Sequence, residues 1–126
     1  PGERSAAEKE KQVLLRLAAV GGAGRDNVIK YRCIEEDLER VFLVMELFLC
    51  SLFDVIARPA NAMAALGDRE RLPRLGSEEE RMRVARELLS GTAFLHANGV
   101  VHSDIRPKNV LFTRCPSGGG RLGAQV

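Results

Sequence analysis

The apolar residues at the start of the chain are spaced as on one face of a helix. Residues 3–20 are rich in Ala, Glu, Lys, Gln and Leu, which are good helix formers. Val13, Leu14 and Leu17 recur at helical spacing and give that helix an apolar face. The glycines of residues 21–24 end the pattern, because Gly commonly follows the last helical residue. We therefore predict an amphipathic helix over residues 3–20.

The residues that follow alternate between apolar runs and a polar turn. Residues 28–33 mix apolar, β-branched and aromatic side chains, residues 35–40 are polar, and residues 41–45 form a continuous apolar run. This order predicts a β-hairpin. Residues 51–56 then predict a short helix that begins with Ser51 as its cap.

The second half of the chain holds the clearest helical pattern. Residues 57–76 contain several Pro and Gly residues and are longer than most loops, which indicates an insertion. Residues 77–97 predict a helix in which Ser77 and Glu80 form a capping box. Its predicted apolar face consists of residues at three- and four-residue steps, namely Met82, Ala85, Leu88, Leu89, Thr92, Ala93 and Leu95 or His96.

The stretch VVHSDIRPKNVLF, residues 100–112, has apolar ends and a polar centre. This pattern predicts a strand, a tight loop and a second strand. In the loop, Asp104 can take a proton from a hydroxyl, the Asn109 carbonyl oxygen suits Mg²⁺, and Arg106 suits a phosphate. Together these groups fit phosphoryl transfer. The alternative is an ordinary polar loop whose Asp and Asn cap turns.

Composition narrows the classes of protein to consider. The chain has 126 residues and a formal net charge of +2, and this near balance of charge gives little support to direct nucleic-acid binding. Its hydrophobic content of 45% is too high for a disordered chain. No apolar run approaches the ~20 residues needed to span a membrane, and the N-terminus lacks a signal-peptide core. Cys33, Cys50 and Cys115 are predicted to be free, mostly buried thiols of a reducing compartment.

The polar loop resembles the H-R-D-x-x-x-x-N catalytic loop of the eukaryotic protein kinases, Ser/Thr type. His102, Asp104 and Asn109 match that motif, and Pro107 lies where Ser/Thr kinases commonly carry Pro. The resemblance implies that Asp104 orients and deprotonates the substrate hydroxyl. It also implies that Asn109 binds one Mg²⁺ and that Arg106 steadies the transferred phosphate.

Two positions of this loop depart from the family. Ser103 stands where most kinases have Arg, which in the family pairs with a phosphate on the activation loop. The resemblance therefore points to a kinase that does not rely on that switch. Arg106 stands where Ser/Thr kinases usually have Lys, which keeps the charge and changes the shape of the donor.

The resemblance extends to the residues before this loop. The N-terminal helix resembles the regulatory helix of the kinase small lobe, whose Glu pairs with the phosphate-binding Lys. Glu10 is the candidate for that Glu, and Glu8 is the alternative. By position, Met45 would be the gatekeeper of the adenine pocket, with backbone contacts to adenine at Glu46 and Phe48. Ordinary core roles for Met45, Leu47 and Phe48 are the alternative.

These matches imply an α+β fold, an incomplete protein-kinase-like fold of two lobes. Residues 1–45 would form part of the small lobe, residues 46–50 the hinge, and residues 51–126 part of the large lobe. The large-lobe part would include the insertion at 57–76 and the catalytic loop at 102–109. The run NVIKYRCIEEDLERVFLVMEL is similar to the inositol-requiring stress-sensor kinases of the endoplasmic reticulum, which pair a kinase with a ribonuclease.

The implied function is transfer of the ATP γ-phosphate to a protein hydroxyl, with ATP and Mg²⁺ as cofactors and a protein substrate. We expect the chain to lack the G-x-G-x-x-G phosphate loop, the V-A-I-K-like lysine and Asp-Phe-Gly, and the isolated chain to be inactive. A pseudokinase-like scaffold or allosteric binding module is the alternative. We expect a cytoplasmic location, or the cytosolic part of a larger membrane-anchored protein, and no nucleic-acid contact or membrane segment in this chain.

Overall fold

The computed structural model describes residues 2–60, 64, 75–114 and 122–126. Helices and strands are mixed, which confirms the predicted α+β class. The chain forms two compact units. The first consists of Pro1–Gly22 and Ile29–Glu46, and the second of Ala23–Val28 and Leu47–Val126.

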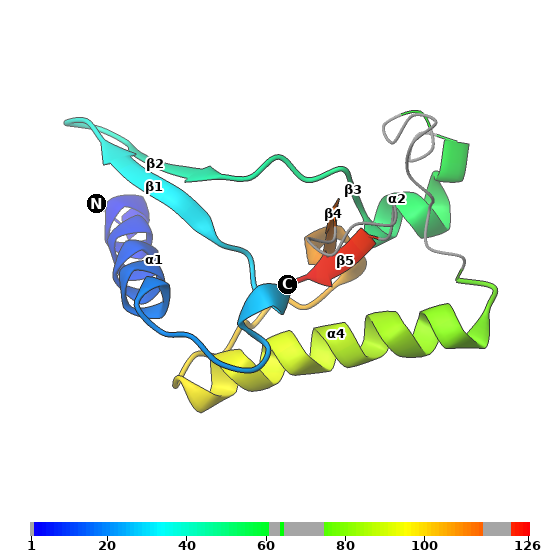
Figure 1. Ribbon diagram of the computed structural model, residues 1–126. Coiled ribbons are helices and arrows are strands. Elements are labelled where there is room, and N and C mark those ends of the chain that lie inside the picture. The colour runs from blue at the N-terminus through cyan, green and yellow to red at the C-terminus, as the bar shows by residue number, and fades with distance from the viewer. Residues whose placement is uncertain (1, 61–63, 65–74, 115–121) are drawn as a thin grey trace. The chain divides into compact units, whose positions relative to one another are not determined.

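The first unit contains helix α1 (Gly2–Ala18) and a β-hairpin (Figure 1). The predicted helix is confirmed, and its apolar face is the expected one, because Leu17 is buried while Val13 and Leu14 are half-buried. The helix ends before the glycines, and Gly22 adopts a φ of 127°, a conformation that favours Gly.

The hairpin pairs β1 (Tyr31–Glu36) with β2 (Val41–Met45) in antiparallel register, with Glu36 opposite Val41. Asp37 shapes the turn, because its side chain accepts hydrogen bonds from the backbone N–H groups of Glu39 (2.8 Å) and Arg40 (2.7 Å). The second strand has the predicted bounds. The first begins at Tyr31 instead of residue 28, because Val28 is buried in the second unit, directly after the 3₁₀ turn η1 (Arg25–Asn27).

The second unit contains an antiparallel sheet in the order β3 (Cys50–Ser51), β4 (Leu111–Arg114), β5 (Leu122–Gln125). Helix α2 (Leu52–Ala57) follows β3, and the long helix α4 (Glu78–Ala97) contacts β5 and η1 (Figure 1). A core cluster of Cys50, Val84, Val110 and Phe112 lies between these elements. The sheet and the helix are therefore joined by apolar packing directly beside the end of the predicted catalytic loop.

The predicted hairpin around residues 100–112 is half correct. Its second strand forms as β4, but the first is wrong, since Val100 and Val101 form no strand. Val101 is 73% exposed, and no strand pairs with it among the residues that the structure describes. A β-branched pair alone does not make a strand without a partner to complete its hydrogen bonds.

Helix α4 has nearly the predicted bounds, and part of the predicted face is correct, since Leu95 is buried and Leu88 packs against the core cluster, but the rest of the buried face differs. The buried residues are Val84, Gly91, Phe94 and Leu95, whereas the predicted Met82 and Leu89 are 46% and 70% exposed. Gly91 explains the difference. A Cβ at Gly91 would lie 2.5 Å from the Asn27 carbonyl oxygen and 3.1 Å from Val126 Cγ1, so other parts of the chain approach the helix at this glycine. Hydrophobic periodicity does not mark a glycine as part of a buried face.

The predicted capping box at the start of α4 is also wrong. Ser77 is the N-cap but makes no side-chain hydrogen bond to the helix. Glu80 instead pairs with Arg83 Nη2 at 2.9 Å, and Arg83 Nη1 contacts Glu87 at 2.8 Å. A charged partner one turn away competes for the Glu that the box would need.

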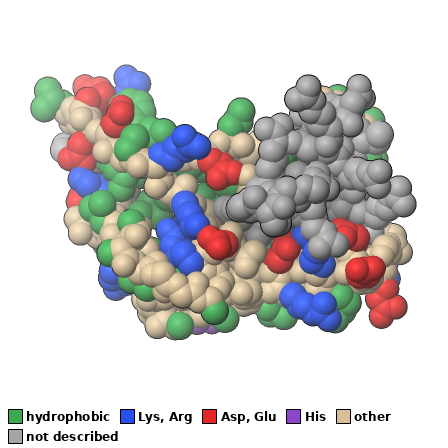
Figure 2. Space-filling view, in the orientation of Figure 1, with side chains coloured by type: hydrophobic (Ala, Val, Ile, Leu, Met, Phe, Trp, Pro, Cys, Tyr) green, Lys and Arg blue, Asp and Glu red, His purple; other side chains and the backbone are tan. Residues whose placement is uncertain are grey.

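The surface carries both signs of charge. On the face shown in Figure 2, basic, acidic and apolar side chains are interspersed. Cys33 is exposed, whereas Cys50 is buried, and burial raises the pKa of the Cys50 thiol to about 11. The prediction of mostly buried thiols is therefore wrong for Cys33, and Cys115 lies outside the described residues. No helix in the described part of the chain is long and apolar enough to cross a membrane.

We predict that Gly91→Ala lowers the free energy of unfolding. Ala in place of Gly inside a helix ordinarily stabilises it by about 1 kcal/mol. Here the added methyl would meet the Asn27 carbonyl oxygen at 2.5 Å, and overpacking of this kind costs ~1–3 kcal/mol. Urea denaturation followed by circular dichroism measures the change. Gly76→Ala is the control, since nothing lies within 4 Å of a Cβ at that position. A stabilised Gly91→Ala protein would contradict the described contact.

Candidate active site

The loop between α4 and β4 is anchored at both ends. Where α4 ends, the backbone N–H of Val100 donates to the Leu95 carbonyl oxygen at 2.9 Å, and Gly99 turns the chain with a φ of 72°. At the other end, Val110 and Phe112 are fully buried in the core cluster. The polar residues between them are exposed on a base that cannot shift without disturbing the core.

Within this loop, three predicted site residues meet. The side-chain amide of Asn109 donates to Asp104 Oδ2 at 2.7 Å and to the Asp104 carbonyl oxygen at 3.0 Å. Arg106 Nε lies 3.2 Å from Asp104 Oδ1. Both members of that ion pair remain more than half exposed, at 56% for Asp104 and 59% for Arg106. The two carboxylate oxygens therefore have different partners, and both stay within reach of solvent.

The backbone around Asp104 is shaped by its neighbours. Ser103 adopts a φ of 67°, in the left-handed region, and its hydroxyl donates to the Val101 carbonyl oxygen at 3.4 Å. The Asp104 N–H donates to His102 Nδ1 at 3.2 Å. Pro107 then begins the 3₁₀ turn η3 (Pro107–Asn109), where its fixed φ suits the first position. This sequence of turns returns Asn109 to the side of Asp104.

The loop carries side-chain oxygens of the kind that bind a hard cation. The Asn109 amide nitrogen is used in holding Asp104, and within the described residues no hydrogen bond uses its carbonyl oxygen. One such oxygen fits Mg²⁺, which keeps several waters and takes further ligands from substrate phosphates. Among the residues that the structure describes, no group of three or more His, Cys, Asp and Glu side chains is placed to hold a metal ion.

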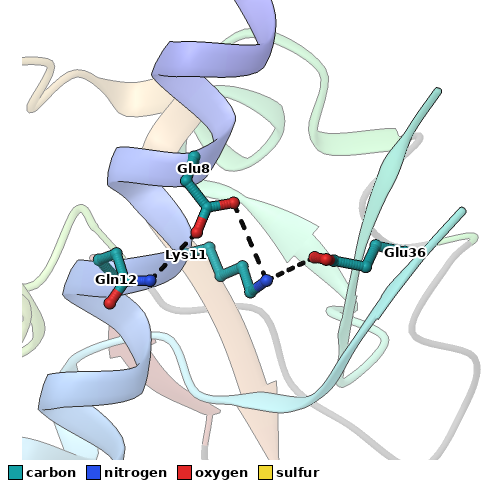
Figure 3. Close-up of polar contacts among 4 residues, drawn as sticks. All are labelled: Glu8, Lys11, Gln12 and Glu36. Atoms are coloured by element: carbon teal, nitrogen blue, oxygen red, sulfur yellow. Dashed lines mark hydrogen bonds and ion pairs between the residues drawn. The ribbon is translucent and has the colours of Figure 1, made fainter. Parts of the chain in front are cut away.

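In the first unit, the two candidate glutamates of α1 differ in their partners. Glu8 accepts a hydrogen bond from Gln12 at 3.1 Å and lies 3.8 Å from Lys11 Nζ, which also pairs with Glu36 of β1 (Figure 3). Glu10 is exposed and forms no ion pair among the described residues. Burial, and to a smaller degree the charge of Glu10, raises the pKa of Tyr31. The carboxylate of Glu10 therefore lies near the start of β1.

The predicted hinge residues are divided between the two units. Met45 ends β2 and Glu46 follows it in the first unit, whereas Phe48 belongs to the second. Met45 and Leu47 are exposed, so the alternative of ordinary core roles is wrong for these two residues, while Phe48 is half-buried. The N–H of Leu49 donates to the Phe112 carbonyl oxygen at 3.0 Å, so the chain after Phe48 is tied to β4. The adenine contacts proposed for these positions remain a prediction.

Helix α2 supports the loop through contacts that the sequence did not reveal. The Leu52 N–H donates to the Val110 carbonyl oxygen at 2.8 Å, and Lys108 Nζ lies 5.0 Å from the centre of the Phe53 ring. The predicted Ser51 cap is confirmed, and it is a full capping box with Asp54. Phe53 and Lys108 are 55 positions apart, and no sequence pattern links an aromatic residue to a cation at such a distance.

The Ser51–Asp54 capping box also lowers the pKa of the Asp54 carboxyl. Ser51 Oγ accepts from the Asp54 N–H at 3.1 Å and donates to Asp54 Oδ2 at 2.7 Å, and the Ser51 N–H donates to Oδ2 at 3.0 Å. These bonds, with the Ser51 hydroxyl first, lower the pKa of Asp54 below its ordinary value of 3.8. The ionised form of Asp54 therefore stabilises the folded chain.

The expected absence of a G-x-G-x-x-G phosphate loop stays a prediction, although the spacing itself occurs in the sequence. Gly118, Gly120 and Gly123 carry it, after the predicted catalytic loop and not before it. Gly118 and Gly120 lie outside the described residues. The printed sequence contains neither Asp-Phe-Gly nor a V-A-I-K run.

Comparison with known proteins gives one family match. The family described as "Protein kinase domain" matches residues 2–117. Calcium-dependent protein kinase 22 of Oryza sativa subsp. japonica is 32% identical over 114 residues, which cover 88% of this chain and 17% of that protein. Calcium/calmodulin-dependent serine/threonine-protein kinase 1 of the same organism is 36% identical over 91 residues, or 72% of this chain and 13% of that protein.

A relative from another subfamily is nearly as similar. The serine/threonine-protein kinase/endoribonuclease ireA of Aspergillus fumigatus is 33% identical over 86 residues, or 68% of this chain and 7% of that protein. The relatives thus come from mixed Ser/Thr kinase families, and the stress-sensor subfamily is not favoured among them. The chain spans a fifth or less of the length of each of these proteins.

We predict that Ser51→Ala destabilises the fold in a pH-dependent way. Loss of an N-cap costs ~0.5–2 kcal/mol near neutral pH. Because the folded pKa of Asp54 is lowered, its contribution is present above the ordinary value of 3.8 and is lost as the pH falls through the folded pKa. The difference between wild type and variant should therefore shrink in acid, as measured by urea denaturation at several pH values. Ser77→Ala is the matched control, since Ser77 makes no cap hydrogen bond. Equal losses from both variants would contradict the assignment.

Proposed function

This chain belongs to the Ser/Thr protein kinase family, and we propose that the protein containing it transfers the γ-phosphate of ATP to a hydroxyl of a protein substrate. The observation that carries the proposal is the Asp104 carboxylate, held by Asn109 at 2.7 Å and exposed to solvent. An exposed carboxylate fixed in direction can orient a substrate hydroxyl and accept its proton.

The other loop residues take complementary roles in this proposal. The Asn109 amide nitrogen fixes Asp104, and its carbonyl oxygen would hold Mg²⁺. When bound, Mg²⁺ neutralises charge on the phosphates. Arg106 contacts Asp104 Oδ1 at 3.2 Å, and its exposed guanidinium can turn toward a transferred phosphate. Positioning and charge neutralisation account for most of the catalysis of phosphoryl transfer, and these three groups can supply the contribution that the loop makes to both.

ATP binding in this proposal uses residues outside the loop. Adenine would contact the backbone at Glu46 and Phe48, beside Met45. Glu10 is favoured over Glu8 as the partner of the phosphate-binding Lys, because Lys11 and Gln12 already contact Glu8. We place this reaction in the cytoplasm, or in the cytosolic part of a membrane-anchored protein.

A scaffold function is the second candidate. The Arg106–Asp104 ion pair favours it, because the guanidinium at 3.2 Å already occupies Oδ1 of the carboxylate that would receive the substrate proton. In that case the domain would bind partners without transferring phosphate. The two candidates are separated by activity measurements on the full-length protein.

We predict that Asp104→Asn in the full-length protein lowers kcat by ~10²–10⁴-fold, the share typical of a general base. The amide keeps the shape of the side chain and cannot accept the proton, so ATP binding should be unchanged. Transfer of labelled phosphate to a generic protein substrate measures the loss. Glu39→Gln, at an exposed turn of the hairpin, is the control for loss of a carboxylate. A wild-type protein that binds ATP but transfers no phosphate would favour the scaffold.

We also predict that the isolated 126-residue chain has no phosphoryl-transfer activity. It contains neither the Asp-Phe-Gly whose Asp binds Mg²⁺ in the family nor the V-A-I-K-like lysine that contacts the nucleotide phosphates. The assay uses ATP, Mg²⁺ and a generic substrate, with the Asp104→Asn chain purified in parallel to reveal a contaminating kinase. Turnover by the wild-type chain that exceeds that of Asp104→Asn would overturn the prediction.

A further inference from the structure

Two exposed cations share one aromatic ring beside the candidate active site. Lys108 Nζ lies 5.0 Å from the centre of the Phe53 ring, and Arg58 Cζ lies 5.7 Å from the same centre. Lys108 belongs to η3, while Phe53 belongs to α2 and Arg58 caps its C-terminal end. Phe53 is half-buried, and both cations are exposed. All three residues lie in the second unit.

The positions of these cations are fixed by the fold. Ser51 pairs with Leu111 of β4, and the Leu52 N–H bonds to the Val110 carbonyl oxygen at 2.8 Å, so α2 begins on the central strand of the sheet. Attraction to the ring face then holds the ammonium and the guanidinium. A charge held in place loses less side-chain entropy when it binds a partner than a freely moving lysine does.

The charges of this cation pair are available to a ligand. Neither Lys108 nor Arg58 forms an ion pair with any residue in the described ranges. The acidic neighbour is Asp54, whose carboxylate is already bound to Ser51, with the charge of Arg58 as a minor influence on its pKa. The local balance is therefore positive, two cations against one capped carboxylate.

The cation pair also lies within reach of a substrate placed on Asp104. Lys108 precedes Asn109, whose amide is 2.7 Å from Asp104. Four residues of chain span at most ~14 Å when extended, and the 3₁₀ turn shortens that distance. An extended peptide advances about 3.3 Å per residue, so a side chain two to four positions from the phosphoacceptor reaches the same region.

We propose that Lys108 and Arg58 together form a subsite for an acidic side chain of the protein substrate, two to four residues from the accepting hydroxyl. The proposal rests on the proposed kinase function. It makes the two residues determinants of specificity, and it predicts that acidic protein segments are preferred over basic ones. Coulomb attraction to a Glu or Asp of the substrate supplies the preference, and a Lys or Arg there is repelled.

The test compares three serine peptides that differ only in having Glu, Ala or Lys at the positions two to four residues from Ser. With the full-length protein, kcat/KM for the Glu peptide should exceed that for the Ala peptide by roughly two- to fivefold per ion pair, the range of exposed pairs. Lys108→Glu should reverse the order and favour the Lys peptide. Arg58→Glu should do the same to a smaller degree, and Lys108→Arg should retain the wild-type order.

Binding is measured in parallel, by fluorescence anisotropy of the labelled peptides, so that the two proposals can fail separately. If no peptide is phosphorylated, the kinase function fails, and tighter binding of the Glu peptide that is lost in Lys108→Glu still supports the subsite. An unchanged peptide order in Lys108→Glu and Arg58→Glu overturns the subsite. An equal fall in kcat for all three peptides, with KM unchanged, also overturns it, because Lys108 would then only brace the loop.

Discussion

The hydrogen bonds from one side-chain amide hold the candidate active site together. Asn109 Nδ2 contacts both the carboxylate and the backbone oxygen of Asp104, so one group fixes the direction of the acid and the path of the loop. Such bonds on an exposed surface contribute only ~0.5–3 kcal/mol, the upper end applying to charged partners. They persist because Val110 and Phe112, on the far side of η3, are fully buried. Apolar packing thus determines the geometry of a polar loop.

The fold could be predicted where local sequence decides it. The bounds of α4, the strand β2 and the Ser51 cap follow from periodicity and capping chemistry, and they are confirmed. The part of the buried face of α4 around Gly91 could not be predicted, because distant backbone approaches the helix at this glycine. The predicted strand at Val101 is wrong for a similar reason. A strand needs a neighbouring strand for its hydrogen bonds, and the β propensity of a residue does not show whether that neighbour exists.

The same distinction between local and distant contacts applies to the candidate site. The spacing of Asp104 and Asn109 is a short-range property that the sequence shows directly, and in the structure their side chains lie 2.7 Å apart. The choice between Glu8 and Glu10 depends on Lys11, whose other partner, Glu36, lies 25 positions away. Phe53 and Lys108 are farther apart still, Phe53 belongs to no motif, and Lys108 occupies an unspecified position of the loop motif. The contacts of Lys11 with Glu36 and of Lys108 with Phe53 therefore could not be predicted from local sequence.

The contrast between the two described cysteines bears on how this domain can be labelled. With its pKa raised to about 11, the buried Cys50 carries roughly one thiolate in ten thousand molecules at pH 7. Cys33 is exposed on β1, in the first unit. Of these two thiols, a maleimide dye would attach to the one on the hairpin and leave unmodified the one in the sheet next to the predicted catalytic loop. A fluorophore introduced at Cys33 would therefore report on the first unit without altering the apolar core to which Cys50 belongs.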